Sequence, residues 1–365
     1  MKLGVDAALV EGELVPGDVE IADGVIAGYG LASANGRGIA VPGFVDLQVN
    51  GFGGVDFLDA DADGYARAGD ALLETGVTAY VPTFITAEED RLVDALHAVP
   101  KSSAAGPTIL GVHLEGPFLS STRIGAHPVK LRRDPDVALA ARLVESGPVV
   151  LMTIAPELPG SGQLVTFLHG RGVIVSCGHS DATATEAHAV FDQGVATVTH
   201  LFNAMRPLGH RDPGIVGAAL ARPDIVVQII VDGVHLAPEV VQVVWRAAAG
   251  RVALVTDAIA AAGAGDGQFR LGDVDVDVRY GAARRTDDGV LAGSVVTMIE
   301  AIRNLHALGV PLERALDAAS SVPARVLGST TVGRIERGAA ADVVVLDDEL
   351  QIERVLIGGN TRVAA

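Results

Sequence analysis

The feature that most constrains the fold is a regular alternation of short apolar, β-rich runs with helical stretches through the middle of the chain. Eight such runs start about 20 to 40 residues apart, which leaves room for one strand and one helix in each interval. The runs cover 45–50, 79–82, 109–115, 149–155, 173–177, 196–200, 226–231 and 252–257. Helical stretches are expected at 63–75, 88–97, 136–145, 182–193 and 238–249, with two more near 295–307 and 312–320.

Eight strand–helix units without an internal sequence repeat predict an α/β fold, a (β/α)₈ TIM-like barrel. The alternative is an open, doubly wound sheet. That alternative is disfavoured because the Gly-x-Gly-x-x-Gly fingerprint of a dinucleotide-binding sheet does not follow the first strand. The segment 263–289 interrupts the alternation, and we expect an inserted hairpin or loop there.

The two ends of the chain differ from the middle. Residues 1 to about 40 hold short strand-like runs broken by glycine, and 341–346 and 352–357 look similar. We expect both ends to pair in one small β-sandwich domain. The predicted domains are therefore a small β domain of 1–41 together with 332–365, and a barrel over 42–331.

Composition excludes several classes of partner. The chain has 27 Lys plus Arg against 45 Asp plus Glu, a net charge of −18 that would repel nucleic acid and anionic membranes. No charge-free stretch exceeds 13 residues, well short of a membrane span, and acidic residues stand where a signal peptide would be apolar. The single cysteine, Cys177, excludes an internal disulfide and fits the reducing cytoplasm, where we expect the protein.

Polar and ionisable side chains stand at the ends of the predicted strands, where a barrel carries its active site. They are Gln48, Asn50, His113, Glu115, His179, His200 and Asp257. Because every second residue of a strand shares a face, these side chains are expected to converge on the barrel axis.

One glutamate, two histidines and an open position are the ligand set of many catalytic zinc sites. Glu115, His179 and His200 are therefore candidate metal ligands. Asp257 is left as a carboxylate beside the metal, where it can take a proton from water. A single histidine at a strand end is usually structural, so the inference depends on the combination. His113 shares a face with Glu115 and is expected to support the site.

Several motifs, in order over nearly the whole chain, resemble a known family. They lie at 41–46, 113–118, 178–183, 199–205, 232–235, 255–258, 333–335 and 341–342. Together they resemble the N-acetylglucosamine-6-phosphate deacetylase family of the amidohydrolase superfamily. The resemblance implies hydrolysis of N-acetyl-D-glucosamine 6-phosphate to D-glucosamine 6-phosphate and acetate.

The resemblance also implies roles for individual residues. Glu115, His179 and His200 would hold one divalent metal ion per subunit, zinc first, with iron or cobalt as alternatives. Asp257 would activate water and then protonate the leaving amine. His127 would polarise the acetyl carbonyl and stabilise its oxyanion.

Substrate contacts follow from the same resemblance. They are Ala126, His127, Asn203, Ala204, Arg211, His235, Leu291, Ala292 and Gly293. Arg211 and His235 would bind the phosphate, and phosphate ligands in this family can cross a dimer interface, so a homodimer is expected. Taken alone, Arg211 also fits a solvated loop and His235 a helix entry. Ser294, after Gly293, also fits a helix N-cap.

Two departures from the superfamily pattern predict one metal ion instead of two. Many amidohydrolases begin with a His-x-His pair, where this chain has Gln48-Val49-Asn50. Many bridge two metals with a carbamylated lysine after strand four, and no lysine follows the fourth run here. Arg123 stands where the family often has a lysine, and this third departure concerns the contact of the loop before His127 with the substrate.

Three other functions stay open at this point. The same chemistry on N-acetylgalactosamine 6-phosphate differs by one epimeric hydroxyl. A cyclic amide hydrolase such as a dihydroorotase is disfavoured by the two departures above. A non-catalytic, amidohydrolase-like scaffold would be expected to lack metal ligands, and here Glu115, His179, His200 and Asp257 are all present.

Overall fold

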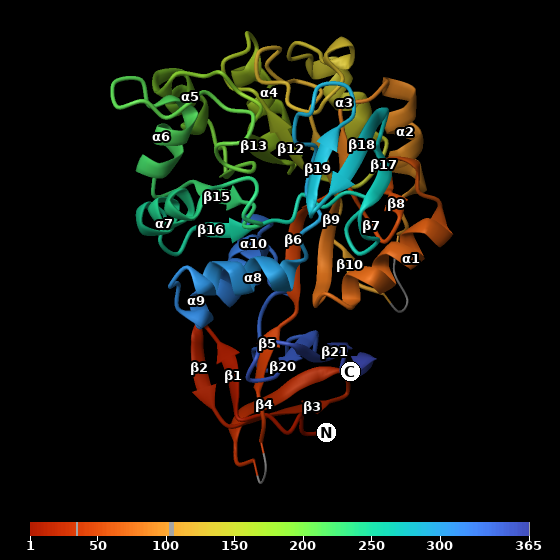
Figure 1. Ribbon diagram of the computed structural model, residues 1–365, viewed down its shortest axis with the longest axis vertical. Helices are drawn as coiled ribbons and strands as arrows, with labels where there is room; N and C mark the ends of the chain where they lie inside the picture. Colours follow the sequence, from red (N-terminus) through yellow and green to blue (C-terminus); the bar gives the residue numbers. More distant parts are fainter. Residues whose placement is uncertain (34–35, 102–105, 365) are drawn as a thin grey trace.

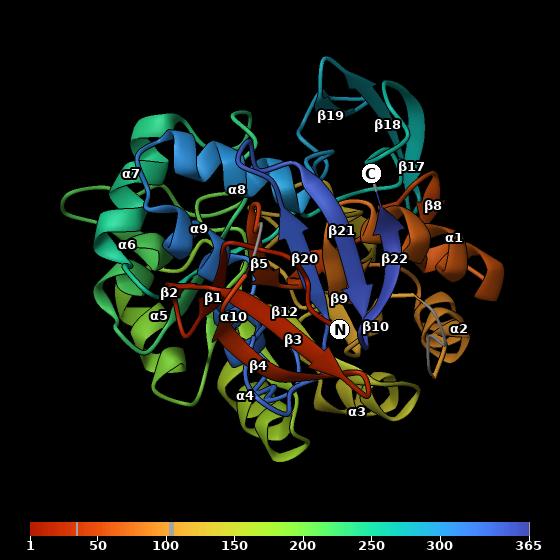
Figure 2. The ribbon, with the colours of Figure 1, turned by 90° about the horizontal axis from the view of Figure 1, so that it is seen from below.

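The computed structural model describes residues 1–33, 36–101 and 106–364. Figure 1 shows a barrel with its helices in the upper part and a smaller β domain below it, where both ends of the chain lie. Seen from below, the helices surround the barrel and the terminal strands cross its lower end (Figure 2).

Eight parallel strands form the barrel. In order around it they are β6 (Phe44–Val49), β9 (Val77–Ile85), β11 (Val112–Glu115), β12 (Val149–Ile154), β13 (Ile174–Cys177), β14 (Thr197–Val198), β15 (Val226–Ile229) and β16 (Val252–Leu254). The ring closes where the Asp257 N–H donates to the Gln48 carbonyl at 2.9 Å and Val49 bridges Ala258. The predicted (β/α)₈ barrel is confirmed, and each predicted run overlaps one of these strands.

Helices cover the outside of the barrel. They are α1 (Ala62–Leu73), α2 (Glu89–Ala98), α3 (Val137–Glu145), α4 (Ser161–Gly170), α5 (Ala184–Phe191), α6 (Gly214–Ala221), α7 (Pro238–Ala247), α8 (Met298–Ala307), α9 (Leu312–Ala318) and α10 (Ser321–Val326), with short 3₁₀ turns η1 (Phe57–Asp59) and η2 (Val129–Leu131). Sequence patterning missed α4, α6 and α10. Helix α6 is glycine-rich and apolar on nearly every side, so it shows no amphipathic period.

Within the described ranges, no helix has the length and apolar character that a bilayer crossing requires.

The small domain joins the two ends of the chain. Its six-stranded sheet has the order β2 (Glu13–Pro16), β1 (Ala7–Val10), β5 (Ile39–Pro42), β20 (Val343–Leu346), β21 (Ile352–Ile357) and β22 (Asn360–Ala364). Antiparallel pairing of β5 with β20 brings N- and C-terminal segments together, as expected. The hairpin of β3 (Asp18–Ala22) and β4 (Val25–Leu31) contributes Val19 and Ile26 to a separate small core with Val343. The exact domain boundaries stay a prediction, and residues 34–35 and 365 lie outside the described ranges.

The segment that interrupts the alternation folds as a three-stranded antiparallel sheet. Its strands are β17 (Gly267–Leu271), β18 (Val274–Arg279) and β19 (Ala282–Arg285), one strand more than the expected hairpin. Its buried face packs in one apolar cluster with Ile85 and Ala126 of the barrel. The sheet therefore lies beside the end of β9, on the part of the barrel away from the small domain (Figure 1). Short strands β7 (Gly51–Phe52), β8 (Val55–Asp56) and β10 (Thr108–Ile109) complete the structure.

Candidate metal and catalytic site

A cavity of about 330 Å³ opens at the carboxyl ends of the barrel strands. Among its lining residues are these predicted ones: Glu115, Ala126, His127, His179, His200, Asn203, Ala204, His235, Asp257, Leu291 and Gly293. Two predicted substrate contacts do not line it: Ala292 is fully buried in the inserted sheet's cluster, and Arg211 is exposed. The lining also includes aliphatic residues that sequence patterning did not single out, Ile85, Ile230, Leu271 and Val290.

Three buried side chains converge at the floor of the cavity. Glu115 Oε1 lies 3.1 Å from His179 Nε2 and 2.9 Å from His200 Nε2, and the two Nε2 atoms are 3.2 Å apart. Burial would raise the pKa of Glu115, but the three imidazoles beside its carboxylate, those of His127, His179 and His200, hold that pKa well below its usual value. The carboxylate is therefore ionised, as a metal ligand must be.

The hydrogen-bond chemistry of this cluster fits a bound cation. His179 Nδ1 lies 3.1 Å from the Arg123 carbonyl oxygen, which can only accept, so Nδ1 carries the proton. Burial lowers the pKa of His179 to about 4, so the ring is neutral and Nε2 holds a lone pair. That lone pair faces the Glu115 carboxylate, and two acceptors at this distance need a positive charge between them. The donor set and a carbonyl that orients a ligating imidazole are typical of zinc sites.

Asp257 stands beside the cluster and is held by two amides of the first strand. Gln48 Nε2 donates to Asp257 Oδ1 and to Glu115 Oε1, both at 3.0 Å, and Asn50 Nδ2 donates to Asp257 Oδ1 at 2.7 Å. Burial, then the charge of Glu115, raises the pKa of Asp257 to about 6. Where a two-metal site would have a His-x-His pair, this chain places two amide donors that orient the carboxylates.

His127 is fixed in one tautomer. Its Nδ1 lies 3.2 Å from the backbone nitrogen of Thr86, and an amide N–H can only donate. Nδ1 must therefore accept, and the neutral ring carries its proton on Nε2. Nε2 lies 3.5 Å from Glu115 Oε2, and His127 lines the cavity. The arrangement presents an N–H donor toward the place where an oxyanion would form.

The backbone at this site adopts conformations that only glycine takes easily. His179, His200 and Asp257 have φ values of 48°, 26° and 50°. Non-glycine residues in the left-handed region are uncommon and gather at functional sites. Asp257 is held there by the Ser294 N–H, which donates to the Asp257 carbonyl at 2.8 Å. Ser294 is not the N-cap of α8; that residue is Thr297, in a capping box with Glu300.

The remaining charged residues near the cavity are mostly paired. His235 Nδ1 donates to Asp232 Oδ2 at 2.6 Å, which leaves Nε2 for the cavity. Arg123 Nε donates to Asp181 Oδ1 at 2.8 Å, so its side chain is occupied outside the cavity lining. Arg211 is exposed, and within the described ranges no hydrogen bond or ion pair occupies its guanidinium.

A buried hydroxyl network next to the candidate metal ligands went unnoticed in the sequence. Thr153 Oγ1 lies 2.7 Å from His113 Nε2 and 2.7 Å from Thr199 Oγ1, and Ser176 Oγ lies 2.5 Å from Thr199 Oγ1. All four side chains are fully buried. Thr153 thus connects the strand that carries Glu115 with the residue before His200. The supporting role of His113 stays a prediction, and Thr153 is the contact through which His113 would act.

We expect Thr153→Val to weaken metal binding about tenfold and to lower the free energy of unfolding by about 1–3 kcal/mol, because His113 and Thr199 each lose a buried partner. Metal affinity by competition with a chelator and denaturant unfolding measure both effects. Thr153→Ser should restore them. Thr78→Val is the matched control, since Thr78 is equally buried but its hydroxyl has no hydrogen-bond partner among the described residues. Equal effects of both valine variants would contradict a role for the network.

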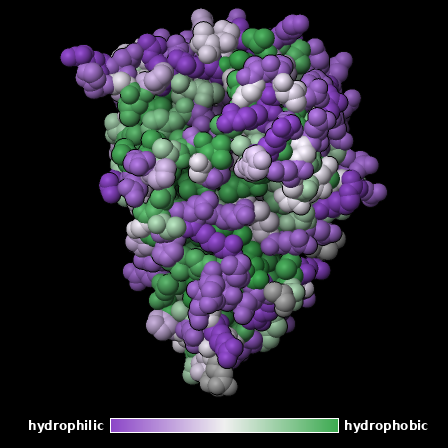
Figure 3. All heavy atoms as spheres, viewed as in Figure 1, coloured by the Kyte–Doolittle hydropathy of each residue, from purple (hydrophilic) through white to green (hydrophobic). Residues whose placement is uncertain are grey.

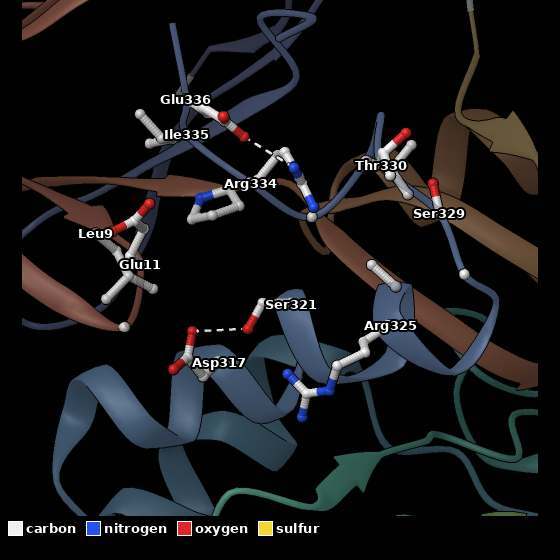
Figure 4. A pocket seen from close by; sticks show the side chains of 16 residues that line it. Leu9, Glu11, Asp317, Ser321, Arg325, Ser329, Thr330, Arg334, Ile335 and Glu336 are labelled. Carbon is white, nitrogen blue, oxygen red and sulfur yellow. Dashed lines mark hydrogen bonds and ion pairs between the residues drawn. The ribbon is translucent and has the colours of Figure 1, made fainter. Parts of the chain in front are cut away.

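A larger cavity, of about 420 Å³, lies elsewhere, at the junction of the small domain with α9 and α10. Figure 4 shows that its charged groups partly satisfy one another: Arg334 pairs with Glu336, and Asp317 accepts from Ser321. The one metal-ligating cluster found among the described residues is Glu115, His179 and His200. The chemistry is therefore placed in the smaller cavity.

The sequence of this chain matches one family of known proteins. A model of the amidohydrolase family matches residues 39–362. N-acetylglucosamine-6-phosphate deacetylase from Rattus norvegicus is 41% identical over 342 residues, 89% of this chain and 83% of that protein. The enzyme of the same name from Homo sapiens is 40% identical over 340 residues, with the same two coverages.

The solved structures that are similar to this chain include enzymes of the same name. A mutant of N-acetyl-D-glucosamine-6-phosphate deacetylase from Mycobacterium smegmatis, in complex with N-acetyl-D-glucosamine-6-phosphate, superposes with a TM-score of 0.95 at 38% identity, covering 100% of this chain and 99% of that one. The Thermotoga maritima N-acetylglucosamine-6-phosphate deacetylase superposes with a TM-score of 0.90 at 31% identity, covering both chains fully.

Proposed function

This chain belongs to the amidohydrolase family, among its N-acetylglucosamine-6-phosphate deacetylases, and we propose that it hydrolyses N-acetyl-D-glucosamine 6-phosphate to D-glucosamine 6-phosphate and acetate. The observation that carries the proposal is one cavity that joins Glu115, His179 and His200 with Asp257 and His127. Support also comes from the similar Mycobacterium smegmatis structure, which holds this sugar phosphate.

Glu115, His179 and His200 would hold one divalent metal ion, for which zinc suits the ligand set and iron or cobalt are alternatives. When bound, the ion supplies Lewis-acid chemistry to water and to the acetyl carbonyl. Gln48 and Asn50 donate N–H groups at the place where a second ion would need lone pairs, so one ion per chain is proposed.

Asp257 moves the proton. Its carboxylate accepts a proton from the attacking water as the water oxygen bonds to the carbonyl carbon. The protonated Asp257 carboxyl group then delivers that proton to the amide nitrogen while the C–N bond breaks, which yields acetate and the amino sugar. Gln48 and Asn50 keep the carboxylate oriented for both steps, and its raised pKa suits a group that must take and return a proton.

His127 stabilises the charge that develops on the carbonyl oxygen. The Thr86 N–H fixes the imidazole with its proton on Nε2, so Nε2–H donates to the oxyanion of the tetrahedral intermediate. Removing one such donor typically costs about 10²- to 10³-fold in kcat.

The phosphate is bound at the other side of the cavity. His235, held by Asp232, offers Nε2 there, and Asn203 and Ala204, which follow the neighbouring strand β14, line the same cavity. Arg211 is exposed beyond the cavity lining, so we propose that it reaches the phosphate across a homodimer interface, as the partner's Arg211. Exposed Leu208 lies near Arg211 in the sequence, and exposed Val234 directly precedes His235. Figure 3 shows hydrophobic residues gathered on the face over α6, which supports an interface there.

Amine release from paired substrates tests this function. We expect the metal-loaded protein to hydrolyse N-acetylglucosamine 6-phosphate with a kcat/KM about 10³-fold above that for N-acetylglucosamine, because each charge-assisted hydrogen bond to the phosphate adds about 1.5–3 kcal/mol. The N-acetylgalactosamine 6-phosphate arm decides between the two epimers. No amine release from any arm, with metal bound, would favour the non-catalytic scaffold. A cytoplasmic location stays a prediction from the single, buried Cys177.

A further inference from the structure

We propose that Ile85 and Leu271 form the wall of an acyl pocket, and that this wall limits the N-acyl group of the substrate to acetyl. The inference rests on the proposed deacetylase function and names which residues select the acyl group. Both side chains line the cavity and are nearly buried, at 3% and 4% exposure.

The order of the strands places this wall opposite the sugar phosphate. Ile85 is the last residue of β9, and Asn203 and Ala204 follow β14. In the ring β6-β9-β11-β12-β13-β14-β15-β16, β9 and β14 are four strands apart, which is diametrically opposite in a barrel of eight. A substrate whose phosphate end lies at the β14 side therefore directs its far end toward β9.

The catalytic groups then decide which end of the substrate reaches β9. His127 Nε2–H takes the carbonyl oxygen, and its ring is held by Thr86, the residue after Ile85. The amide nitrogen must face Asp257 to receive its proton. The remaining substituent of the carbonyl carbon, the methyl group, therefore faces Ile85.

The inserted sheet closes this end of the cavity. Leu271, the last residue of β17, shares an apolar cluster with Ile85, Ala126 and Ala292. At the neighbouring Gly272, a Cβ atom would lie 3.3 Å from Ile85 Cδ1, so the turn after β17 packs directly on Ile85. The wall is aliphatic and well packed, which accommodates a methyl group but leaves little space for a longer chain.

The test uses glucosamine 6-phosphate carrying N-acetyl, N-propionyl or N-butyryl groups, with amine release as the readout. We expect the wild type to lose kcat/KM with each added methylene. Leu271→Ala should raise the ratio of N-butyryl to N-acetyl kcat/KM at least tenfold, since one methylene in an apolar pocket changes this ratio about 10- to 200-fold. Leu271→Val, a smaller truncation, should give an intermediate ratio even if the alanine variant folds poorly.

Ile230→Ala is the matched control, because Ile230 is a buried aliphatic residue of the same cavity that follows β15, on the phosphate side. Its ratio should equal that of the wild type. Hydrolysis of the acetyl substrate with an unchanged chain-length profile in both Leu271 variants would overturn the acyl wall alone. A wild-type protein that releases no amine from the acetyl substrate would instead overturn the proposed function.

Discussion

Asp257→Asn is expected to lower kcat by about 10³- to 10⁴-fold while the protein keeps its metal. Asparagine has the same shape, and its oxygen still accepts from Gln48 Nε2 and Asn50 Nδ2. It cannot take a proton from water or return one to the amine. Since Glu115, His179 and His200 are untouched, KM and metal content should change little. Steady-state kinetics and elemental analysis of the same preparation separate the two effects.

The control for Asp257→Asn is Asp46→Asn. Asp46 is also a fully buried aspartate of the barrel, and burial raises its pKa to about 7. It accepts from Thr256 Oγ1 at 2.6 Å and lies outside the cavity lining. An amide in its place can donate to the same hydroxyl, so kcat should stay within about tenfold. If metal-loaded Asp257→Asn turned over at the wild-type rate, Asp257 would not be the proton carrier.

Glu115→Gln is expected to weaken metal binding more than 100-fold, beyond the 10- to 100-fold typical of residues that only support a ligand. The substitution removes the one anionic ligand, at the point where His179 and His200 both approach within 3.1 Å. Activity should fall with the metal content. Dialysis against a chelator followed by elemental analysis measures the retained ion.

Glu186→Gln is the matched control for Glu115→Gln. The Glu186 substitution removes the same formal charge as the Glu115 substitution. Glu186 forms a capping box with Thr183 at the start of helix α5, and a glutamine side chain can make the same capping contact. Metal content should equal that of the wild type. Unchanged metal content in Glu115→Gln as well would contradict the ligand assignment.

The barrel could be predicted from sequence because its strands are apolar runs spaced for one helix each, and several of them end in polar residues. The sequence pattern predicted no element where polar and apolar residues do not alternate with a helical or strand period. Helix α6 is apolar on nearly every side, and β19 carries two arginines in four residues, so neither showed a period. Pairing with β18, a tertiary interaction, defines β19 as a strand.

The ionisable residues that line the cavity could be singled out because glutamate, histidine and aspartate interrupt the apolar pattern at the strand ends. Their supporting residues could not. Thr86 acts through its backbone N–H, which every residue but proline has, and Thr153 resembles any buried threonine. Leu271 reaches the cavity from an inserted sheet that is distant in sequence. The left-handed backbone of His179, His200 and Asp257 likewise has no sequence signal in a residue other than glycine.

A metal titration measures how many ions per chain the deacetylase activity needs. The metal-free protein receives zinc in steps, and amine release from N-acetylglucosamine 6-phosphate is followed at each step. One site built from Glu115, His179 and His200 predicts activity that rises linearly and saturates at one ion per chain. Saturation at two ions per chain, or full activity without any, would contradict the account of a one-metal deacetylase.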